Sequence, residues 1–226
     1  MLSPGGDGVS ARERHRQIWD SAFCRIFAVM KKNVIFDFGG VIIDWNPHNL
    51  YDGYFGDPAM AQWFIDHICT MEWNAQMDAG KPFAEGVREK VAEFPEWAKE
   101  IRLYGSEWCS MLGEVIPGTY EVMQDMKACG CRLFGLSNWS AETFPLVEND
   151  ISAFGLLEGI IISGREGIVK PDAAIYRLLL ARFSLLAEDC LFIDDRPDNT
   201  AAAEAVGIQS HLFTTSDSLR KAFWGP

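Results

Sequence analysis

Short apolar runs recur along the chain, and most of them end directly in polar residues. Four runs lie at 34–36, 132–136, 159–162 and 190–193, and a further short stretch, Ser210-His-Leu-Phe213, follows near the end of the chain. An unbroken apolar run of this length, bounded by glycine or polar residues, is typical of a strand buried on both faces of a parallel sheet. The pattern therefore predicts four buried strands and a short last strand.

Segments with helical spacing separate these strands, at 119–128, 175–183 and 199–206. The first segment follows Pro117-Gly118, and the last is closed by Gly207. Proline and glycine are common at the start and the end of a helix, respectively. Strands that alternate with helices predict an α/β fold with a doubly wound parallel sheet.

The stretch 46–115 differs from the rest of the chain because it lacks strand-like alternation. Apolar side chains recur at helical period at 60–64 and 83–91, and glycine and proline divide the stretch into short segments. We predict a small helical cap inserted after the first strand, with most of its aromatic residues packed in its interior. The α/β core is then formed by residues 30–45 and 116–226.

Residues 1–29 form a separate amino-terminal extension in this interpretation. Ser10, with Glu13 three residues later, has the spacing of a capping box and predicts a helix over 10–29. We expect the extension to be dispensable for folding. Expression of residues 30–226 tests this expectation, and loss of soluble protein would contradict it.

The composition narrows the class of partner. With 226 residues, of which 48% are hydrophobic, the chain is long enough for one large domain or for a domain with an insert. The net charge of −12 argues against binding to nucleic acid or to an anionic membrane, because both need a basic face. A small anionic substrate is compatible with this charge, since it needs only a local positive pocket.

The six cysteines form no CxxC pair, and Cys129-Gly-Cys131 is too closely spaced for a usual zinc site. We interpret the cysteines as reduced thiols of a cytosolic protein. No apolar run reaches the length of a membrane span, and no signal-type apolar stretch follows the early arginines. These features predict a cytoplasmic protein.

Polar residues follow several of the predicted strands. Asp37 follows the first strand, Ser137-Asn138 the second and Asp194-Asp195 the fourth, while Lys170 comes after the third. A parallel sheet places the carboxyl ends of its strands at one edge, so these residues can meet there. Asp37 and Asp195 would repel each other unless a cation lay between them, and Mg²⁺ prefers such oxygen ligands. A hydroxyl, a backbone amide and a lysine can bind phosphoryl oxygens.

Four motifs carry these residues. They are Asp37-Phe-Gly-Gly-Val, Leu136-Ser-Asn, Lys170-Pro-Asp-Ala-Ala-Ile-Tyr and Phe192-Ile-Asp-Asp-Arg-Pro-Asp-Asn. In this order they resemble the motifs of the haloacid dehalogenase-like (HAD) hydrolase superfamily, over about residues 32–213. The resemblance implies a Rossmann-like core with the helical insert at the site of the cap domain. It is nearest to a branch of sugar-phosphate phosphatases that act on glucose 1-phosphate.

The resemblance implies a nucleophile and a metal site. Asp37 would attack the phosphoryl group and form an aspartyl-phosphate. Mg²⁺ would be held by the Asp37 carboxylate, the Gly39 carbonyl and Asp195, with Asp194 supporting it directly or through water. Asp198-Asn199 would orient the loop that carries Asp194 and Asp195 without binding the metal themselves.

The resemblance also implies a phosphate site. The Ser137 hydroxyl and the Asn138 amide would bind phosphoryl oxygens, and Lys170 would screen the charges of the nucleophile and the phosphate. Glycine at positions 39 and 40 lets the backbone approach the group that Asp37 holds, and Gly40 is assigned to the phosphate site. Asp37, Ser137 and Lys170 are therefore the expected catalytic residues.

One position departs from the family pattern. Most phosphatases of the superfamily have an aspartate two residues after the nucleophile, where it serves as general acid and base, and this chain has Gly39 there. Proton transfer by a placed group is worth about 10²- to 10⁴-fold in rate. The substrate could have a leaving group that needs little protonation, Asp44 or His48 could substitute, or catalysis could be poor.

Three functions follow from these residues. The first is a Mg²⁺-dependent phosphatase of a small phosphorylated metabolite, with a sugar phosphate as one option. The second is a metal-free 2-haloacid dehalogenase, against which Asp194-Asp195 argues because a dehalogenase has no metal to hold. The third is a non-catalytic ligand- or partner-binding protein, which leaves the joint presence of Asp37, Lys170 and Asp195 unexplained.

Overall fold

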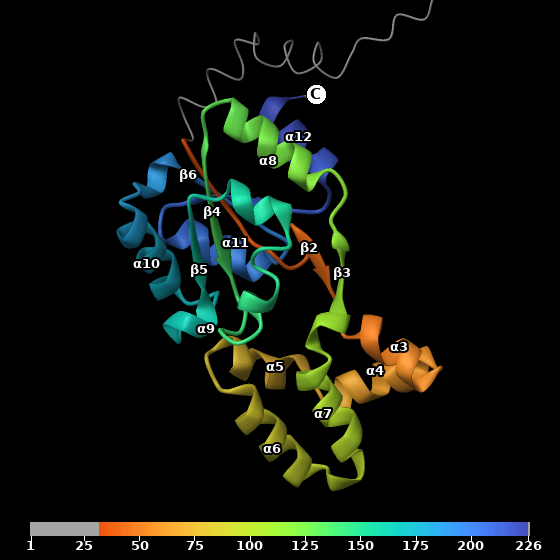
Figure 1. Cartoon of the computed structure of the whole chain (residues 1–226). Helices are drawn as coiled ribbons and strands as arrows, with labels where there is room; N and C mark the ends of the chain where they lie inside the picture. The colour runs from red at the N-terminus through yellow and green to blue at the C-terminus, as the bar shows by residue number, and fades with distance from the viewer. Residues whose placement is uncertain (1–31, 226) are drawn as a thin grey trace, which may run out of the picture.

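The computed structural model describes residues 32–225. Its core is a parallel sheet (Figure 1), and the strand order is β5-β4-β1-β6-β7. The predicted α/β fold with a parallel sheet is confirmed. Strand β1 lies at the centre of the sheet, as its unbroken apolar sequence requires. The strands are β1 (Asn33–Phe36), β4 (Arg132–Ser137), β5 (Gly159–Ile162), β6 (Cys190–Asp194) and β7 (Gln209–Leu212).

Successive residues of β1 face opposite sides of the sheet and join two different hydrophobic clusters. Val34 and Phe36 belong to one cluster, and Ile35 belongs to the other. The first cluster includes residues of α8 and α12, and the second includes residues of α10 and α11. Helices thus cover both faces of the sheet. They are α8 (Thr119–Ala128), α10 (Ala173–Phe183), α11 (Pro197–Ala205) and α12 (Ser216–Trp224).

Local signals set the ends of several of these helices. Helix α8 has the predicted bounds and begins after Gly118, which has a left-handed φ of 81°. The side chain of Asp172 caps α10 by accepting a hydrogen bond from the Ala174 amide at 2.8 Å. Helix α11 begins two residues before the predicted start, because Pro197 is well suited to its first turn.

A two-stranded antiparallel ribbon links the core to the cap. It pairs β2 (Ile43–Trp45) with β3 (Leu112–Val115). The expectation that 46–115 contains no strand is wrong for β3. Its four residues include Gly113 and are only partly buried, so the strand has no periodic pattern and depends on pairing with a distant segment. A Cβ at Gly113 would collide with the Asp44 side chain across the ribbon.

The chain between these two ribbon strands folds into helices that lie beyond the sheet (Figure 1). Buried aromatic side chains fill the space between them, including Tyr51, Phe64, Trp73 and Tyr104. Tyr51 and Phe64 have ring centroids 4.8 Å apart, and Trp73 meets Tyr104 edge to face at 4.9 Å. The helices are α3 (His48–Phe55), α4 (Pro58–His67), α5 (Met71–Asp78), α6 (Phe83–Glu93) and α7 (Ala98–Ser106).

Short elements complete the described chain. Turns of 3₁₀ helix lie at Pro95–Trp97, Trp108–Met111, Phe144–Leu146, Ser152–Leu156 and Ala187–Asp189, and the short helix α9 (Ser163–Glu166) follows β5. Within 32–225, no helix is long and apolar enough to cross a bilayer. The predicted extension 1–29 and its helix lie outside the described residues.

The cysteines fit the expected reduced state in part. Cys69, Cys109, Cys131 and Cys190 form no disulfide, and all of these except Cys109 are buried. Cys129 is disulfide-bonded, so the expectation of a reduced thiol is wrong for that residue.

Candidate active site

Asp37 lies directly beyond the carboxyl end of β1. Its backbone amide donates to the Ile193 carbonyl at 2.9 Å, which continues the β1–β6 pairing by one residue. The Phe38 amide donates to the Asp37 carboxylate at 2.6 Å and orients it. The side chain is nearly buried, with the whole residue 7% exposed. A carboxylate held in this way at the sheet edge is placed to act as a nucleophile.

Lys170 brings a buried positive charge to this carboxylate. Its Nζ lies 2.8 Å from Asp37 Oδ1 and 2.7 Å from Asp194 Oδ2, and it donates to the Leu136 carbonyl at 3.0 Å. Burial opposes the charged form of Lys170, yet the two carboxylates raise its pKa above the usual value. The ammonium therefore stays protonated at neutral pH and neutralises one of the two negative charges beside it.

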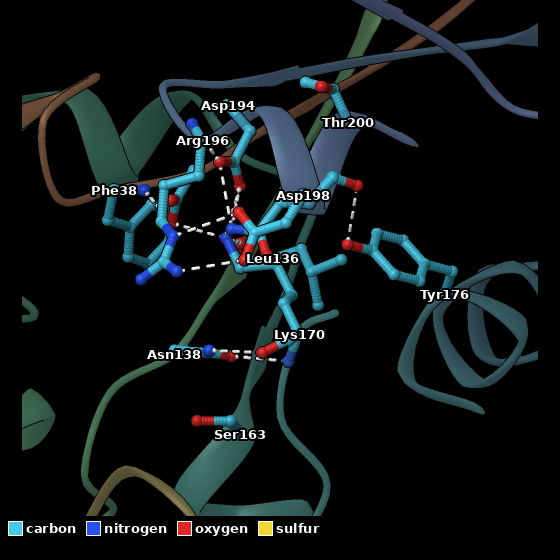
Figure 2. A network of polar contacts seen from close by, with 12 residues as sticks. Phe38, Leu136, Asn138, Ser163, Lys170, Tyr176, Asp194, Arg196, Asp198 and Thr200 are labelled. Atoms are coloured by element: carbon cyan, nitrogen blue, oxygen red, sulfur yellow. Dashed lines mark hydrogen bonds and ion pairs between the residues drawn. The ribbon is translucent and has the colours of Figure 1, made fainter. Parts of the chain in front are cut away.

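The side chain of Asn138 forms hydrogen bonds with both the amide and the carbonyl of Lys170. Its Nδ2 donates to the Lys170 carbonyl at 2.9 Å, and its Oδ1 accepts from the Lys170 amide at 2.8 Å (Figure 2). The Lys170–Pro171 peptide bond, which is cis, follows directly. The sequence assigned Asn138 to phosphate binding through its amide, and this clamp by its side chain was not predicted.

Asp194 is the innermost acid of the site and is fully buried. Besides Lys170, its carboxylate accepts hydrogen bonds from Asn199 Nδ2 at 3.0 and 3.1 Å and from the Arg196 amide at 2.9 Å. Asn199 thus orients this acid from behind, as the sequence predicted for the loop. Asp198 instead pairs with the exposed Arg196 guanidinium at 3.0 Å.

The three acids of the site suit a divalent cation. Asp37, Asp194 and Asp195 each offer a carboxylate oxygen, and these oxygens lie within 4.8 Å of one another. Burial raises the pKa of Asp37 to about 7, although Lys170 opposes the rise. The pKa of Asp195 is raised by burial and by the charge of Asp194. One lysine among three acids leaves excess negative charge, so these oxygen ligands fit Mg²⁺.

The two glycines after Asp37 differ in what surrounds them. Gly40 has a φ of 72°, and a Cβ there would lie 2.5 Å from Asp195 Oδ2. Only glycine therefore allows the loop and Asp195 to approach each other in this way. At Gly39, a Cβ would meet no heavy atom within 4 Å. Space alone therefore does not explain why position 39 lacks a side chain.

A cavity of about 540 Å³ opens between the sheet edge and the cap. The predicted residues Asp37, Ser137, Lys170 and Asp195 all line it, although they come from four separate parts of the chain. The glycines at 39 and 40 and Asn138 also line it. The cap and ribbon supply much of the opposite wall, together with one tryptophan from the core: Asp44, Trp45, Met71, Asn74, Ala75, Asp78, Trp108 and Trp139.

The two substitutes proposed for the missing acid differ in position. Asp44 lines the cavity. His48 is not among the lining residues, and its ring nitrogens lie 2.6 Å from Asp52 Oδ1 and 3.0 Å from Gln62 Oε1. Asp78 at the end of α5 lines the cavity and was missed. No strand end or motif marks it, because it reaches the site only through docking of the cap.

A family model of the haloacid dehalogenase-like hydrolases matches residues 31–207. The chain belongs to this family. The resemblance read from the four ordered motifs is thereby confirmed, and this HAD-like chain is a hydrolase.

Two curated relatives of this HAD-like hydrolase are named as a phosphatase and as a flavin mononucleotide hydrolase. The sesquiterpene phosphatase astK of Aspergillus oryzae is 27% identical over 191 residues, which cover 82% of this chain and 91% of the relative. Flavin mononucleotide hydrolase 1 of Arabidopsis thaliana is 27% identical over 124 residues, which cover 54% of this chain and 50% of the relative. The chain therefore spans about half the length of the second relative.

A solved structure shares the fold of this HAD-like hydrolase. It is a HAD family enzyme of Bacteroides thetaiotaomicron in complex with magnesium and inorganic phosphate. Its TM-score is 0.65 at 17% sequence identity, and the match covers 82% of this chain and 95% of that one.

Proposed function

We propose that this HAD-like hydrolase is a Mg²⁺-dependent phosphatase of a small phosphorylated metabolite, which acts through an aspartyl-phosphate on Asp37. One observation carries the proposal. Asp37 and Asp195 line a single cavity with Lys170, whose Nζ lies 2.8 Å from Asp37 Oδ1. This set supplies a nucleophile, a cation site and a positive charge for the phosphoryl group.

The residues divide the work of phosphoryl transfer. Asp37 would form the bond to phosphorus, and Ser137 and Asn138 would hold the phosphoryl oxygens. Mg²⁺ would be held by Asp37, the Gly39 carbonyl and Asp195, where it would offset the charge of the phosphoryl group. Asp194, fully buried behind Lys170, would support the arrangement by fixing the lysine.

The two other functions fit the site less well. A dehalogenase that works without a metal would gain nothing from three acids within 4.8 Å of one another, because Lys170 neutralises only one of their charges and the rest repel without a further cation. A binding protein without catalysis would have no use for a nearly buried carboxylate beside a buried lysine. Both relatives are also named for the hydrolysis of phosphate esters.

The cavity wall favours an apolar or aromatic leaving group over a sugar. Trp45, Met71, Trp108 and Trp139 line the cavity, and such surfaces bind flat or hydrocarbon groups. The relatives are named for a sesquiterpene and for a flavin mononucleotide. We therefore rank a terpenoid or flavin-like phosphate ahead of the sugar phosphate that the motifs alone had favoured.

Release of inorganic phosphate tests the function. The purified chain is assayed with Mg²⁺ on farnesyl phosphate, flavin mononucleotide, glucose 1-phosphate and p-nitrophenyl phosphate. We expect release that EDTA stops and added Mg²⁺ restores. The variant Asp37→Asn keeps the fold and loses turnover by a factor of about 10³ or more. Activity of Asp37→Asn near that of the parent chain, or indifference to EDTA, would refute the proposal.

A further inference from the structure

The cavity wall contains acids beyond the nucleophile and the cation site. Among the described residues, the acidic residues that line the cavity are Asp37, Asp44, Asp78 and Asp195. Asp37 and Asp195 already have roles in the proposed function. Gly39 leaves open space next to the nucleophile, so a proton donor must come from another element. Asp44 and Asp78 are the two candidates.

Asp78 is held by hydrogen bonds at the interface between the cap and the core. It is the last residue of α5, and its carbonyl accepts a hydrogen bond from the Ser163 hydroxyl at 2.5 Å. Its carboxylate accepts from Asn74 Nδ2 at 2.9 Å, and Asn74 accepts from the Tyr104 hydroxyl at 3.0 Å. Asn74 and Tyr104 are both buried. The carboxylate is therefore held in one orientation, as efficient proton transfer requires.

Asp44 is held by a weaker contact. It lies on ribbon strand β2, and its carboxylate accepts a hydrogen bond from the exposed Asn49 side chain at 3.1 Å. Water competes for both partners of an exposed hydrogen bond, so this contact fixes the carboxylate poorly. Asp78 is therefore the better positioned of the two acids.

The surroundings of Asp78 also favour its protonated form. Burial raises the pKa of the Asp78 carboxyl to about 7, and the negative charge of Asp37 adds to the rise. Hydrogen bonds from the Ser140 amide and from Asn74 oppose it. Among the groups that act on this carboxyl, Asp37 is the one that carries a charge, while Asn74, Ser140 and the nearby Tyr104 are neutral.

We propose that Asp78, supplied by the cap, is the general acid and base of the reaction and replaces the aspartate that is missing at position 39. The inference rests on the proposed phosphatase function. In the first step Asp37 bonds to phosphorus, the bond from phosphorus to the leaving oxygen breaks, and that oxygen takes the proton of Asp78. In the second step Asp78 takes a proton from water, whose oxygen bonds to phosphorus as the bond from phosphorus to Asp37 breaks. Inorganic phosphate leaves and both carboxyl groups are restored.

A series of leaving groups tests this role. Asp78→Asn keeps the size of the side chain and its acceptor for Asn74. We expect kcat/KM of this variant to fall by about 100-fold or more on a simple alkyl phosphate, whose leaving oxygen needs a proton. On p-nitrophenyl phosphate, whose leaving group is stable as an anion, the fall should be less than about tenfold. The decline of kcat/KM above about pH 7 on the alkyl phosphate should disappear in the variant.

Two further variants separate the outcomes. Asp44→Asn is the matched comparison, and Gly39→Asp placed in the Asp78→Asn background should restore alkyl phosphate hydrolysis, because position 39 has room for the side chain. An equal loss on both substrates, or a selective loss in Asp44→Asn alone, would overturn the inference. If the parent chain released phosphate from none of the substrates, both the proposed phosphatase function and the role of Asp78 would be refuted. An active parent with an equally active Asp78→Asn would refute only the role of Asp78.

Discussion

Removal of the Lys170 charge should destabilise the fold as well as stop catalysis. The ammonium lies 2.8 Å from Asp37 Oδ1 and 2.7 Å from Asp194 Oδ2. Lys170 is 3% exposed and Asp194 is fully buried, so water cannot replace the lost partner. Breaking a buried ion pair from one side costs about 3–5 kcal/mol. For a chain of this size that loss corresponds to a fall in Tm of roughly 10 °C.

The measurement is the free energy of unfolding in urea, followed by tryptophan fluorescence in EDTA so that no cation replaces the lysine. Lys170→Met is compared with Lys81→Met, which removes an exposed ion pair with Glu89 at 2.5 Å and should cost at most about 1 kcal/mol. Adding Asp194→Asn to Lys170→Met should recover about 2 kcal/mol of the lost unfolding free energy. The reason is that the buried Asp194 carboxylate, left without Lys170 in the single variant, is no longer charged.

The pH dependence follows from Asp37. Its folded pKa of about 7 lies above the ordinary value of 3.8, so its effect on stability is favourable at low pH and is lost as the pH rises towards about 7. Lys170 lowers the pKa of Asp37 because it stabilises the charged carboxylate. The Lys170→Met variant should therefore lose more unfolding free energy at pH 8 than at pH 5, where Asp37 is protonated. A loss below about 1 kcal/mol at pH 8, equal to that of the surface control, would refute the reasoning.

Two other predictions concern the loops of the site. Gly40→Ala should lower activity and stability, because its Cβ would lie 2.5 Å from Asp195 Oδ2 at a left-handed φ. Gly39→Ala should be tolerated, because a Cβ there meets no heavy atom within 4 Å. Equal effects of the two substitutions on phosphate release and on urea unfolding would contradict this prediction. Asn138→Ala should cost about 1–3 kcal/mol in urea, since the Lys170 amide and carbonyl lose their partners. An unchanged urea midpoint would show that the clamp contributes nothing.

Much of the sheet could be predicted because the determining signals are local. The run 34–36 is apolar without a break, and this identifies a strand whose two faces are both buried. The carboxyl ends of parallel strands share one edge, so Asp37, Ser137 and Asp195 had to come near one another once the strands were recognised. Helix α8 kept its predicted bounds because Pro117-Gly118 precedes it.

The features that the sequence did not determine depend on contacts between distant segments. Strand β3 forms only because β2 lies beside it, and its own four residues lack a strand pattern. The side chain of Asn138 could have faced a ligand, and only the packed loop shows that it holds Lys170. Asp78 is an unremarkable helix residue in the sequence.

The order of the core strands and helices, and the polar residues gathered at the sheet edge, can therefore be predicted from local patterns, because the spacing of apolar residues and the polar residue that ends a strand involve only neighbouring positions. The position of the cap over that edge cannot be predicted in this way. The cap brings Asp78 and the apolar wall of Met71 and Trp108 to the cavity. Its position follows from packing between surfaces far apart in the chain, and no local pattern encodes that packing.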